Sequence, residues 1–255
     1  MQALSASDPR DRHEEAPPHP GPGLSIIIPC YQERGNIAPL FHAVRKAVTG
    51  HDWELIFVDD NSPDGTIDEV WRLAQADSRV RGLLRVGRRG LSSAVIEGVL
   101  SSSAPVVAVM DCDMQHDEAL LAGMADAISH QGYDIAIGSR HVKGGDNAGL
   151  ANAWRRALSG FGIRVAQCLL PIRVSDPMSG FFAMRRALFV QSVGGLSGTG
   201  FKILLDLLMA QKARPQVIEL PFVFRARHEG VSKMDRKVLF QFVQMLFHHL
   251  RRRRR

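Results

Sequence analysis

Val106-Val107-Ala108-Val109-Met110-Asp111-Cys112-Asp113 is the stretch that decides the fold. Its first five residues are apolar and rich in β-branched side chains, which predicts a short, fully buried strand. Two carboxylates, one residue apart, follow at the carboxyl end of that strand, where open α/β sheets bind ligands. Alternate residues of an extended chain point the same way, so Asp111 and Asp113 can reach one site. They would repel each other there, and a divalent cation held with a diphosphate would remove that repulsion.

The order of strand, polar turn and helix also occurs twice before this stretch. Apolar runs at 24–28 and 54–58 predict two more buried strands, and residues 36–48 and 66–76 predict the helices that follow them. The second strand runs into Asp59–Gly65, a segment with strong turn chemistry. This alternation predicts a mainly parallel sheet with helices on both faces. A solvated acidic loop is the alternative explanation of the aspartate pair, and the sheet context favours a ligand site over it.

The composition predicts one globular domain with a different kind of segment at each end. The chain has 255 residues, of which 45% are hydrophobic, enough for a sizeable core. We expect residues 1–23 to form a disordered tail, because residues 8–23 are rich in proline, histidine and charge. That tail lacks the apolar run of a signal peptide. Residues 24–234 are the predicted folded domain, and residues 235–255 a helix with a basic tail.

Charge and cysteine content argue against several classes of function. The formal net charge is +6, of which the five arginines at 251–255 supply +5 and leave +1 for the rest of the chain. The basicity is therefore not a face for nucleic acid. Cys30, Cys112 and Cys168 lack the spacing of a metal site, which favours reduced thiols in a cytosolic compartment. No Gly-x-Gly-x-x-Gly follows the first strand, so a dinucleotide oxidoreductase is not expected.

The segment before the arginines has a broad apolar face. One helical face carries Leu239, Phe242, Val243, Leu246 and Leu250, and further apolar residues widen it. This stripe is wider than a surface helix needs. The segment is too short and too polar to cross a bilayer, which takes about 20 residues. A helix lying in the membrane interface, with arginines that attract anionic lipid, explains both properties. A helix packed on the core with a solvated tail is the alternative.

Several motifs occur in a fixed order along the chain. They are Pro29-x-Tyr31-x-Glu33, the Val58–Gly65 turn, Asp111-x-Asp113, Gln115-His116, Gly138-Ser139-Arg140, Ser175–Phe182 and Arg227-His228-x-Gly230-x-Ser232-Lys233. Together they resemble the family 2 inverting glycosyltransferases of GT-A fold, and among these the dolichol-phosphate and polyprenol-phosphate mannose synthases. The resemblance covers residues 24–250. The chain departs from it at Cys112, where the family usually has alanine. It also departs at Arg88–Ser92, which replaces a Lys-x-Gly-Leu-Gly run and loses a flexible glycine.

The resemblance implies transfer of a hexose, first of all mannose from GDP-mannose, to a polyprenyl or dolichyl monophosphate. One displacement would invert the anomeric centre and give a β-linked lipid-phosphate sugar. The phosphate acceptor is already nucleophilic at neutral pH, so no general base is expected. The enzyme would lie on the cytoplasmic face of a membrane, held by its own helix or by a separate transmembrane partner. Glucose transfer from UDP-glucose is one alternative, and a non-catalytic nucleotide-binding scaffold of a membrane complex is another.

The resemblance also assigns the site residues. Asp111, Asp113 and Gln115 are the expected ligands of Mg²⁺ or Mn²⁺, which would act as a Lewis acid on the leaving diphosphate. Asp113 and Arg140 are the expected catalytic residues, and Arg140 would hold phosphate oxygens in a forked geometry. The expected donor-binding set is Pro29, Tyr31, Glu33, Val58, Asp59, Asp60, Asp111, Cys112, Asp113, Arg140, Arg227 and Lys233. Turn formation and helix capping explain Asp64 and Gly65 better than ligand binding does.

Overall fold

The computed structural model of the protein describes residues 21–143, 167, 170, 172–225, 241, 244–249 and 251. Within these residues, seven strands form one sheet in the order β3-β2-β1-β4-β6-β5-β7. The strands are β1 (Leu24–Cys30), β2 (Trp53–Asp59), β3 (Val80–Leu84), β4 (Val106–Val109), β5 (Ile135–Ser139), β6 (Phe182–Arg185) and β7 (Val217–Pro221). Only β6 pairs antiparallel with its neighbours. The predicted mainly parallel sheet is therefore confirmed.

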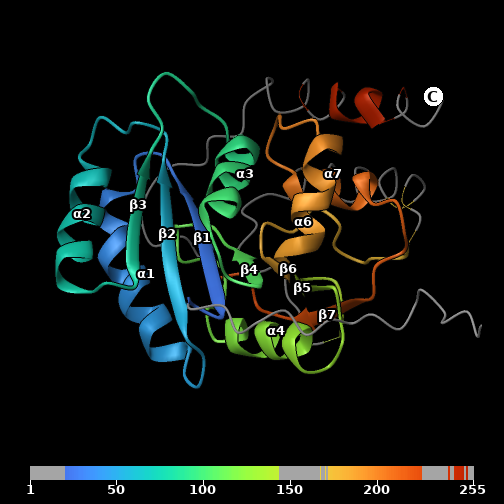
Figure 1. The fold of residues 1–255 in the computed structure, drawn as a ribbon, viewed down its shortest axis with the longest axis horizontal. Helices are drawn as coiled ribbons and strands as arrows, with labels where there is room; N and C mark the ends of the chain where they lie inside the picture. The colour runs from blue at the N-terminus through green and yellow to red at the C-terminus, as the bar shows by residue number, and fades with distance from the viewer. Residues whose placement is uncertain are drawn as a thin grey trace, which may run out of the picture.

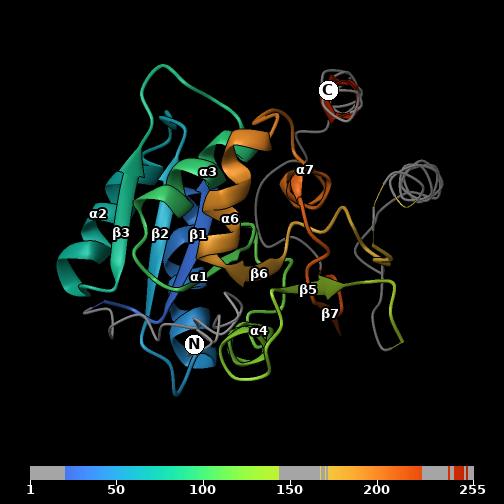
Figure 2. The same ribbon diagram turned by 45° about the vertical axis from the view of Figure 1, so that its right-hand side comes forward.

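Helices cover both faces of this sheet (Figure 1). One hydrophobic cluster joins the sheet to α1 (Arg34–Ala47), α2 (Thr66–Ala76) and α4 (Leu120–Ser129). A second cluster joins the other face to α3 (Leu91–Ser101), α6 (Arg186–Ser192), which the 3₁₀ turn Val193–Gly195 follows, and α7 (Ile203–Ala210). Figure 2 shows α3 and α6 together on this second face. The structure therefore has three layers, with the sheet in the middle.

Burial on both faces explains the uninterrupted apolar runs in the strands. Ile26 and Ile28 belong to the first cluster, and Ile27 between them belongs to the second. All three side chains are fully buried. A half-exposed strand would alternate polar and apolar residues, whereas a strand covered on both faces needs apolar residues at every position. The apolar runs therefore predicted these strands to within two residues at either end.

Strand order reverses at β1. From β1 the chain moves outward to β2 and then to β3, and α3 carries it back to β4 on the other side of β1. The turns after β1 and β4 therefore lead away in opposite directions. In open α/β sheets, ligands bind at such a switch point, outside the carboxyl ends of the strands. Asp111 and Asp113 follow β4 at that point.

The described part of the C-terminal segment packs against the second face of the domain. Residues 244–249 are helical, and Met245 and His249 are 1% and 2% exposed. The Nε2 atom of His249 lies 2.6 Å from Oδ1 of the fully buried Asp206 in α7. Phe247, on the same helix, is 58% exposed. One side of the helix is thus packed on the core, as the alternative explanation required, while Phe247 remains accessible.

Most residues of the expected interfacial face, namely Leu239, Phe242, Val243 and Leu250, lie outside the described residues. Among the helices that the structure describes, none is both long and apolar enough to cross a membrane.

A buried histidine packs at the end of the sheet among aromatic rings. His116 stacks on Phe181, with ring centroids 5.1 Å apart, and meets the edge of Phe222 at 5.7 Å. Burial lowers the pKa of His116 to about 4. The ring is therefore neutral at physiological pH, and its Nδ1 atom accepts the backbone N–H of Asp111 at 3.1 Å.

The close packing of α3 on the sheet can be tested at Gly98. A Cβ atom at Gly98 would clash with Cγ2 of Ile27 and lie 2.9 Å from Cγ2 of Val58. We expect Gly98→Ala to lower the free energy of unfolding by about 1–3 kcal/mol in urea denaturation, because the core cannot accept the extra atom. Gly123 in α4 has open space around it. Gly123→Ala should instead stabilise by roughly 0.5–1 kcal/mol, and similar effects at both positions would contradict the packing.

Neutral His116 predicts a pH dependence of stability. The folded pKa of about 4 lies below the ordinary value of 6.5. Between these values the unfolded chain binds a proton that the folded chain excludes. The contribution of the neutral His116 ring to the free energy of unfolding is therefore complete above pH 6.5. As the pH falls towards 4, the free energy of unfolding decreases by up to about 3 kcal/mol.

Urea unfolding of the metal-free protein across this window measures the effect. His116→Phe should flatten the pH dependence. His130→Asn, which changes a side chain that is 72% exposed, should leave it unchanged. If the free energy of unfolding changes equally with pH in the wild type and in His116→Phe, the pH dependence belongs to other groups.

Candidate active site

Three adjacent parallel strands are each followed by a residue with a left-handed backbone. Gln32 after β1, Asn61 after β2 and Met114 after β4 have φ angles of 55°, 55° and 63°, and among the described residues they are the non-glycine positions with positive φ. This conformation is unfavourable for residues with side chains, and it clusters at functional sites. The three turns therefore mark the carboxyl edge of the sheet as the candidate active site.

The acidic motif leaves β4 in a turn that carries the three expected metal ligands. Asp113 is buried, and its Oδ1 accepts the backbone N–H of Gln115 at 3.1 Å. Nε2 of Gln115 donates to the carbonyl oxygen of Arg225 at 3.0 Å. The amide oxygen is therefore the atom of Gln115 that can ligate a cation. The side chain of Asp111 is 39% exposed and lies against Gly180, where an added Cβ would be 3.2 Å from Oδ2 of Asp111.

These oxygen atoms fit a hard divalent cation that is shared with a ligand. Carboxylate and amide oxygens suit Mg²⁺ and Mn²⁺. In the part of the chain that the structure describes, no group of three or more His, Cys, Asp or Glu side chains could hold a metal alone. Mg²⁺ sites commonly use one or two carboxylates together with phosphate oxygens of the substrate. The turn therefore suits a cation that binds with a diphosphate.

Arg140 follows β5 and is held by a buried carboxylate. Its Nε and Nη2 donate to the two carboxylate oxygens of Asp176 at 2.8 and 3.0 Å. Asp176 is fully buried and also accepts the backbone N–H of Arg140 at 3.4 Å. Glu219 in β7 orients this loop, because it accepts the backbone N–H groups of Ser175 and Asp176. The guanidinium fork therefore holds Asp176, and its further N–H groups are the donors that could reach a phosphate.

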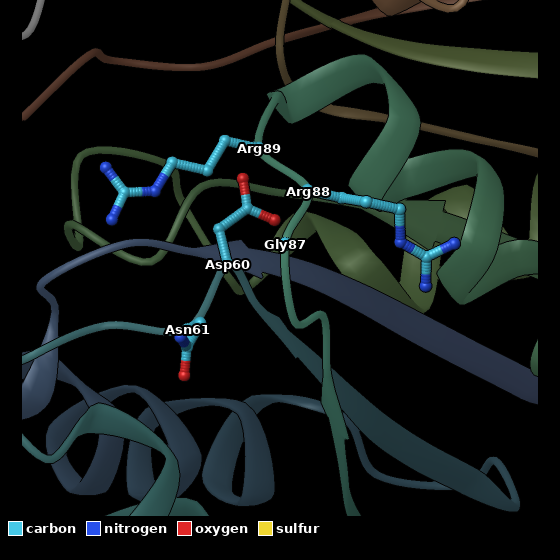
Figure 3. Close-up of a pocket in the computed structure, with 5 residues that line it drawn as sticks. All are labelled: Asp60, Asn61, Gly87, Arg88 and Arg89. Carbon is cyan, nitrogen blue, oxygen red and sulfur yellow. The ribbon is translucent and has the colours of Figure 1, made fainter.

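Asp60 organises a loop beside the end of β2. Its carboxylate pairs with buried Arg85 and accepts the backbone N–H of Gly90 at 2.7 Å. Figure 3 shows this carboxylate pointing towards the loop that carries Arg88 and Arg89, whereas Asn61 points the opposite way. Asp60, Asn61, Gly87, Arg88 and Arg89 line a cavity of about 430 Å³. Of these residues, Asp60 belongs to the expected donor-binding set.

The other expected donor contacts divide into accessible and buried side chains. The guanidinium of Arg89 lies over the ring of Tyr31, 4.4 Å from its centroid, so Tyr31 borders the same loop. Pro29 is half-buried at the end of β1, and Glu33 accepts the Asn36 side-chain amide at 2.7 Å. Asp59 is fully buried and accepts the Ser62 backbone N–H at 2.9 Å. Of the two aspartates at the end of β2, the cavity-lining Asp60 is therefore the better candidate for contact with a donor.

Two expected contacts have side chains that face the core. Val58 belongs to the second hydrophobic cluster and Cys112 to the first. Only backbone atoms of these residues could contact a donor. Burial, followed by a hydrogen bond with Cys112, raises the pKa of the Cys30 thiol, and both of these cysteines are free. Arg227 and Lys233 lie outside the described residues.

The sequence did not identify Arg85, Asp176 or Lys202 as site residues. Asp176 lies within the Ser175–Phe182 motif, Arg85 lies just before Arg88–Ser92, and Lys202 belongs to no quoted motif. The role of each depends on a partner far along the chain. Arg85 meets Asp60 across 25 positions, and Asp176 meets Arg140 across 36. Asp64 behaves as expected, because it accepts N–H and O–H groups of Thr66 at 3.1 and 2.6 Å in the turn before α2, whose N-cap is Gly65.

Solved structures of known glycosyltransferases share this fold. A glucosyl-3-phosphoglycerate synthase from Mycobacterium tuberculosis, solved with Mn²⁺, UDP-glucose and phosphoglyceric acid, superimposes with a TM-score of 0.65 at 18% identity, over 91% of this chain and 80% of that one. A mannosyltransferase from Pyrobaculum calidifontis, solved with GDP-mannose and Mn²⁺, gives a TM-score of 0.59 at 18% identity, over 91% of this chain and 64% of that one. These structures have the GT-A fold, which the sequence predicted.

Closer relatives are found by sequence. A dolichol-phosphate mannosyltransferase from Pyrococcus furiosus is 40% identical over 88% of this chain, which spans 62% of that protein's length. A dolichol-phosphate mannosyltransferase from Saccharomyces cerevisiae is 35% identical over 87% of this chain and 85% of its own length. The model of the family called glycosyl transferase family 2 matches residues 25–192. Taken with the geometry of the strand ends, these matches show that the chain belongs to glycosyl transferase family 2.

Proposed function

We propose that the chain transfers mannose from GDP-mannose to a polyprenyl or dolichyl monophosphate, with inversion at the anomeric carbon. The product would be a β-linked lipid-phosphate mannose. The proposal is supported by the relatives that are named dolichol-phosphate mannosyltransferases and by one that is named polyprenol monophosphomannose synthase. It is also supported by the oxygen atoms after β4 that suit a cation and by the cavity beside the end of β2.

The residues divide the chemistry of such a transfer between them. The leaving diphosphate gains charge, and a divalent cation held by Asp111, Asp113 and Gln115 would supply Lewis-acid stabilisation there. Asp60 and the loop that it holds would position the nucleoside. The buried pair of Asp176 with Arg140 fixes the guanidinium in place before substrate arrives, which favours electrostatic stabilisation without reorganisation.

One observation carries the choice of a phosphate acceptor. Arg140 lies near enough to the metal motif for its charge to lower the pKa of His116, which directly follows Gln115. Both carboxylate oxygens of Asp176 accept hydrogen bonds from this arginine. A hydroxyl acceptor would need a carboxylate or imidazole there as a general base. A phosphate monoester is largely dianionic at neutral pH and is attracted by the cation instead. The site therefore suits a lipid monophosphate better than an alcohol.

The acceptor places the enzyme at a membrane surface. Phe247 is exposed on the described part of the C-terminal helix, and Arg251 is exposed shortly after it. An accessible aromatic ring and a run of arginines are suited to the headgroup region of an anionic membrane. We place this surface on the cytoplasmic face of the membrane, with or without a separate transmembrane partner. Its contact with the membrane would keep the active-site edge near the lipid phosphate.

Transfer assays test the proposed reaction directly. Purified protein with Mn²⁺ and a short polyprenyl phosphate should consume GDP-mannose and form an acid-labile lipid-phosphate mannose, while UDP-glucose should be consumed far more slowly. Preference for UDP-glucose would replace mannose by glucose in the proposal. Consumption of neither donor would reject transfer to a lipid phosphate.

Removal of the metal or of one ligand should stop the reaction. We expect EDTA to abolish mannose transfer and Mg²⁺ or Mn²⁺ to restore it. Asp113→Asn should lower kcat by more than about 100-fold, because it removes a charged ligand from the cation that stabilises the leaving group. Asp117→Asn is the control, since Asp117 pairs with Arg225 nearby without belonging to the predicted ligands. Full activity in EDTA would contradict the metal assignment.

The membrane surface can be tested at Phe247 without removing the packed helix. We expect Phe247→Ser to weaken binding to anionic phospholipid vesicles by about 10-fold, because the ring would no longer be buried in the interface. Trp71→Ser is the matched control, since Trp71 is also exposed but lies on α2. High salt should weaken vesicle binding in part, because the arginines act through a screened field. Unchanged flotation of the Phe247 variant would assign membrane contact to another surface.

A further inference from the structure

Lys202 immediately precedes α7, and its side chain reaches the turn between the metal motif and Arg140. Its Nζ atom lies 3.4 Å from the carbonyl oxygen of Met178. At one end of this turn, Gly180 packs against the carboxylate of Asp111. At the other end, Asp176 holds Arg140. The ammonium group therefore lies beside the segment that joins the two halves of the proposed phosphate site.

The charges around Lys202 include both signs. Burial is the main cause that lowers its pKa below the ordinary value of 10.5, and the Arg140 guanidinium lowers it further. Asp176 and Asp111 oppose both effects by favouring the ammonium form. The hydrogen bond to Met178 is long for a charged donor. Lys202 is half-buried, so an anion that binds beside it would offset the partial loss of water around its ammonium group.

The segment that carries Lys202 is fixed from two directions. The carboxylate of Asp206 accepts the backbone N–H of Ser197 at 3.0 Å and that of Gly198 at 3.2 Å, and it pairs with His249. Ser92, in the first turn of α3, donates its hydroxyl to the carbonyl oxygen of Gly200 at 2.9 Å. Donors held in place before the substrate binds stabilise developing charge without a cost in reorganisation. The position of Lys202 is thus built into the fold.

We propose that Lys202 binds phosphate oxygens at the reacting centre, beside Arg140 and Asp111. The proposal rests on the proposed function, because that reaction brings two anionic phosphate groups together. An oxygen of the lipid phosphate forms a bond to the anomeric carbon while the bond from that carbon to the nucleoside diphosphate breaks. The electron pair leaves with the diphosphate, and no proton is transferred to the enzyme. The ammonium donates charged hydrogen bonds to either the entering or the leaving phosphate.

Three variants test this role. Lys202→Met keeps much of the length and removes the charge, and Lys202→Arg keeps the charge. Lys212→Met is the control, because Lys212 is exposed just beyond α7. We expect Lys202→Met to lower kcat/KM by about 100-fold, as loss of one oxyanion donor does. Lys202→Arg should recover part of that loss, and Lys212→Met should stay within about twofold of the wild type.

Binding measurements distinguish the two phosphates. If Lys202 meets the acceptor, Lys202→Met raises KM for the polyprenyl phosphate and leaves the Kd of GDP with Mn²⁺ unchanged. If it meets the leaving diphosphate, the Kd of GDP rises as well. Either result supports the proposal. Activity of Lys202→Met within about twofold of the wild type overturns it. Equal losses in the Met and Arg variants, with equal falls in Tm, also overturn it by assigning Lys202 a purely structural role.

The wild type and the Lys212 variant test the proposed function on their own. If neither transfers mannose to the lipid phosphate, that function is wrong. Titration with inorganic diphosphate and Mn²⁺, and with inorganic phosphate, then still decides the role of Lys202. Weaker binding of either anion to Lys202→Met than to the wild type supports a phosphate site, and equal binding of both rejects it.

Discussion

The reversal of strand order at β1 is the constraint on which the site depends. Because β2 and β4 both pair with β1, the turns after the three strands are held side by side while the chain leaves them in different directions. Apolar residues on both faces of the strands fix this spacing through two separate hydrophobic clusters. The polar residues then need no rigid framework of their own. They are carried by turns whose ends are set by the sheet.

Charge is balanced differently at different strand ends. Asp60 after β2 and Asp176 near β5 each face a buried or half-buried arginine, so the protein itself satisfies them. Asp111 after β4 has the neutral His116 ring 3.8 Å from its carboxylate, and its charge favours the ammonium form of Lys202. The Asp111 side chain is 39% exposed, so a cation that arrives with the nucleotide can reach its carboxylate. Asp176, which is fully buried, acts through the arginine that it holds, whereas the more exposed Asp111 can meet a ligand directly.

The sequence predicted the parts of the fold that depend on local pattern. The helix at 66–76 was predicted with the boundaries that the structure shows, and Asp64 and Gly65 form the turn before it, as expected. β6 was not predicted, because four residues with antiparallel partners far along the chain carry no local signature.

Other features depend on tertiary partners and could not be predicted from local pattern. The guanidinium of Arg140 was correctly placed at a strand end, but its pairing with Asp176 depends on packing across 36 residues. The apolar C-terminal face was recognised, whereas periodicity alone could not show that Met245 and His249 would pack on the domain. The membrane role of the remaining face stays a prediction.

The central claim is that Asp111, Asp113 and Gln115 hold a divalent cation jointly with a nucleoside diphosphate. Titration of Mn²⁺ followed by electron paramagnetic resonance, without and with saturating GDP, measures this most directly. Two carboxylates and an amide should bind Mn²⁺ weakly alone, and GDP should tighten binding by at least about 10-fold, with a reciprocal effect of Mn²⁺ on GDP affinity. A Mn²⁺ affinity that is the same with and without GDP would contradict a shared cation and, with it, the account of how this strand end works.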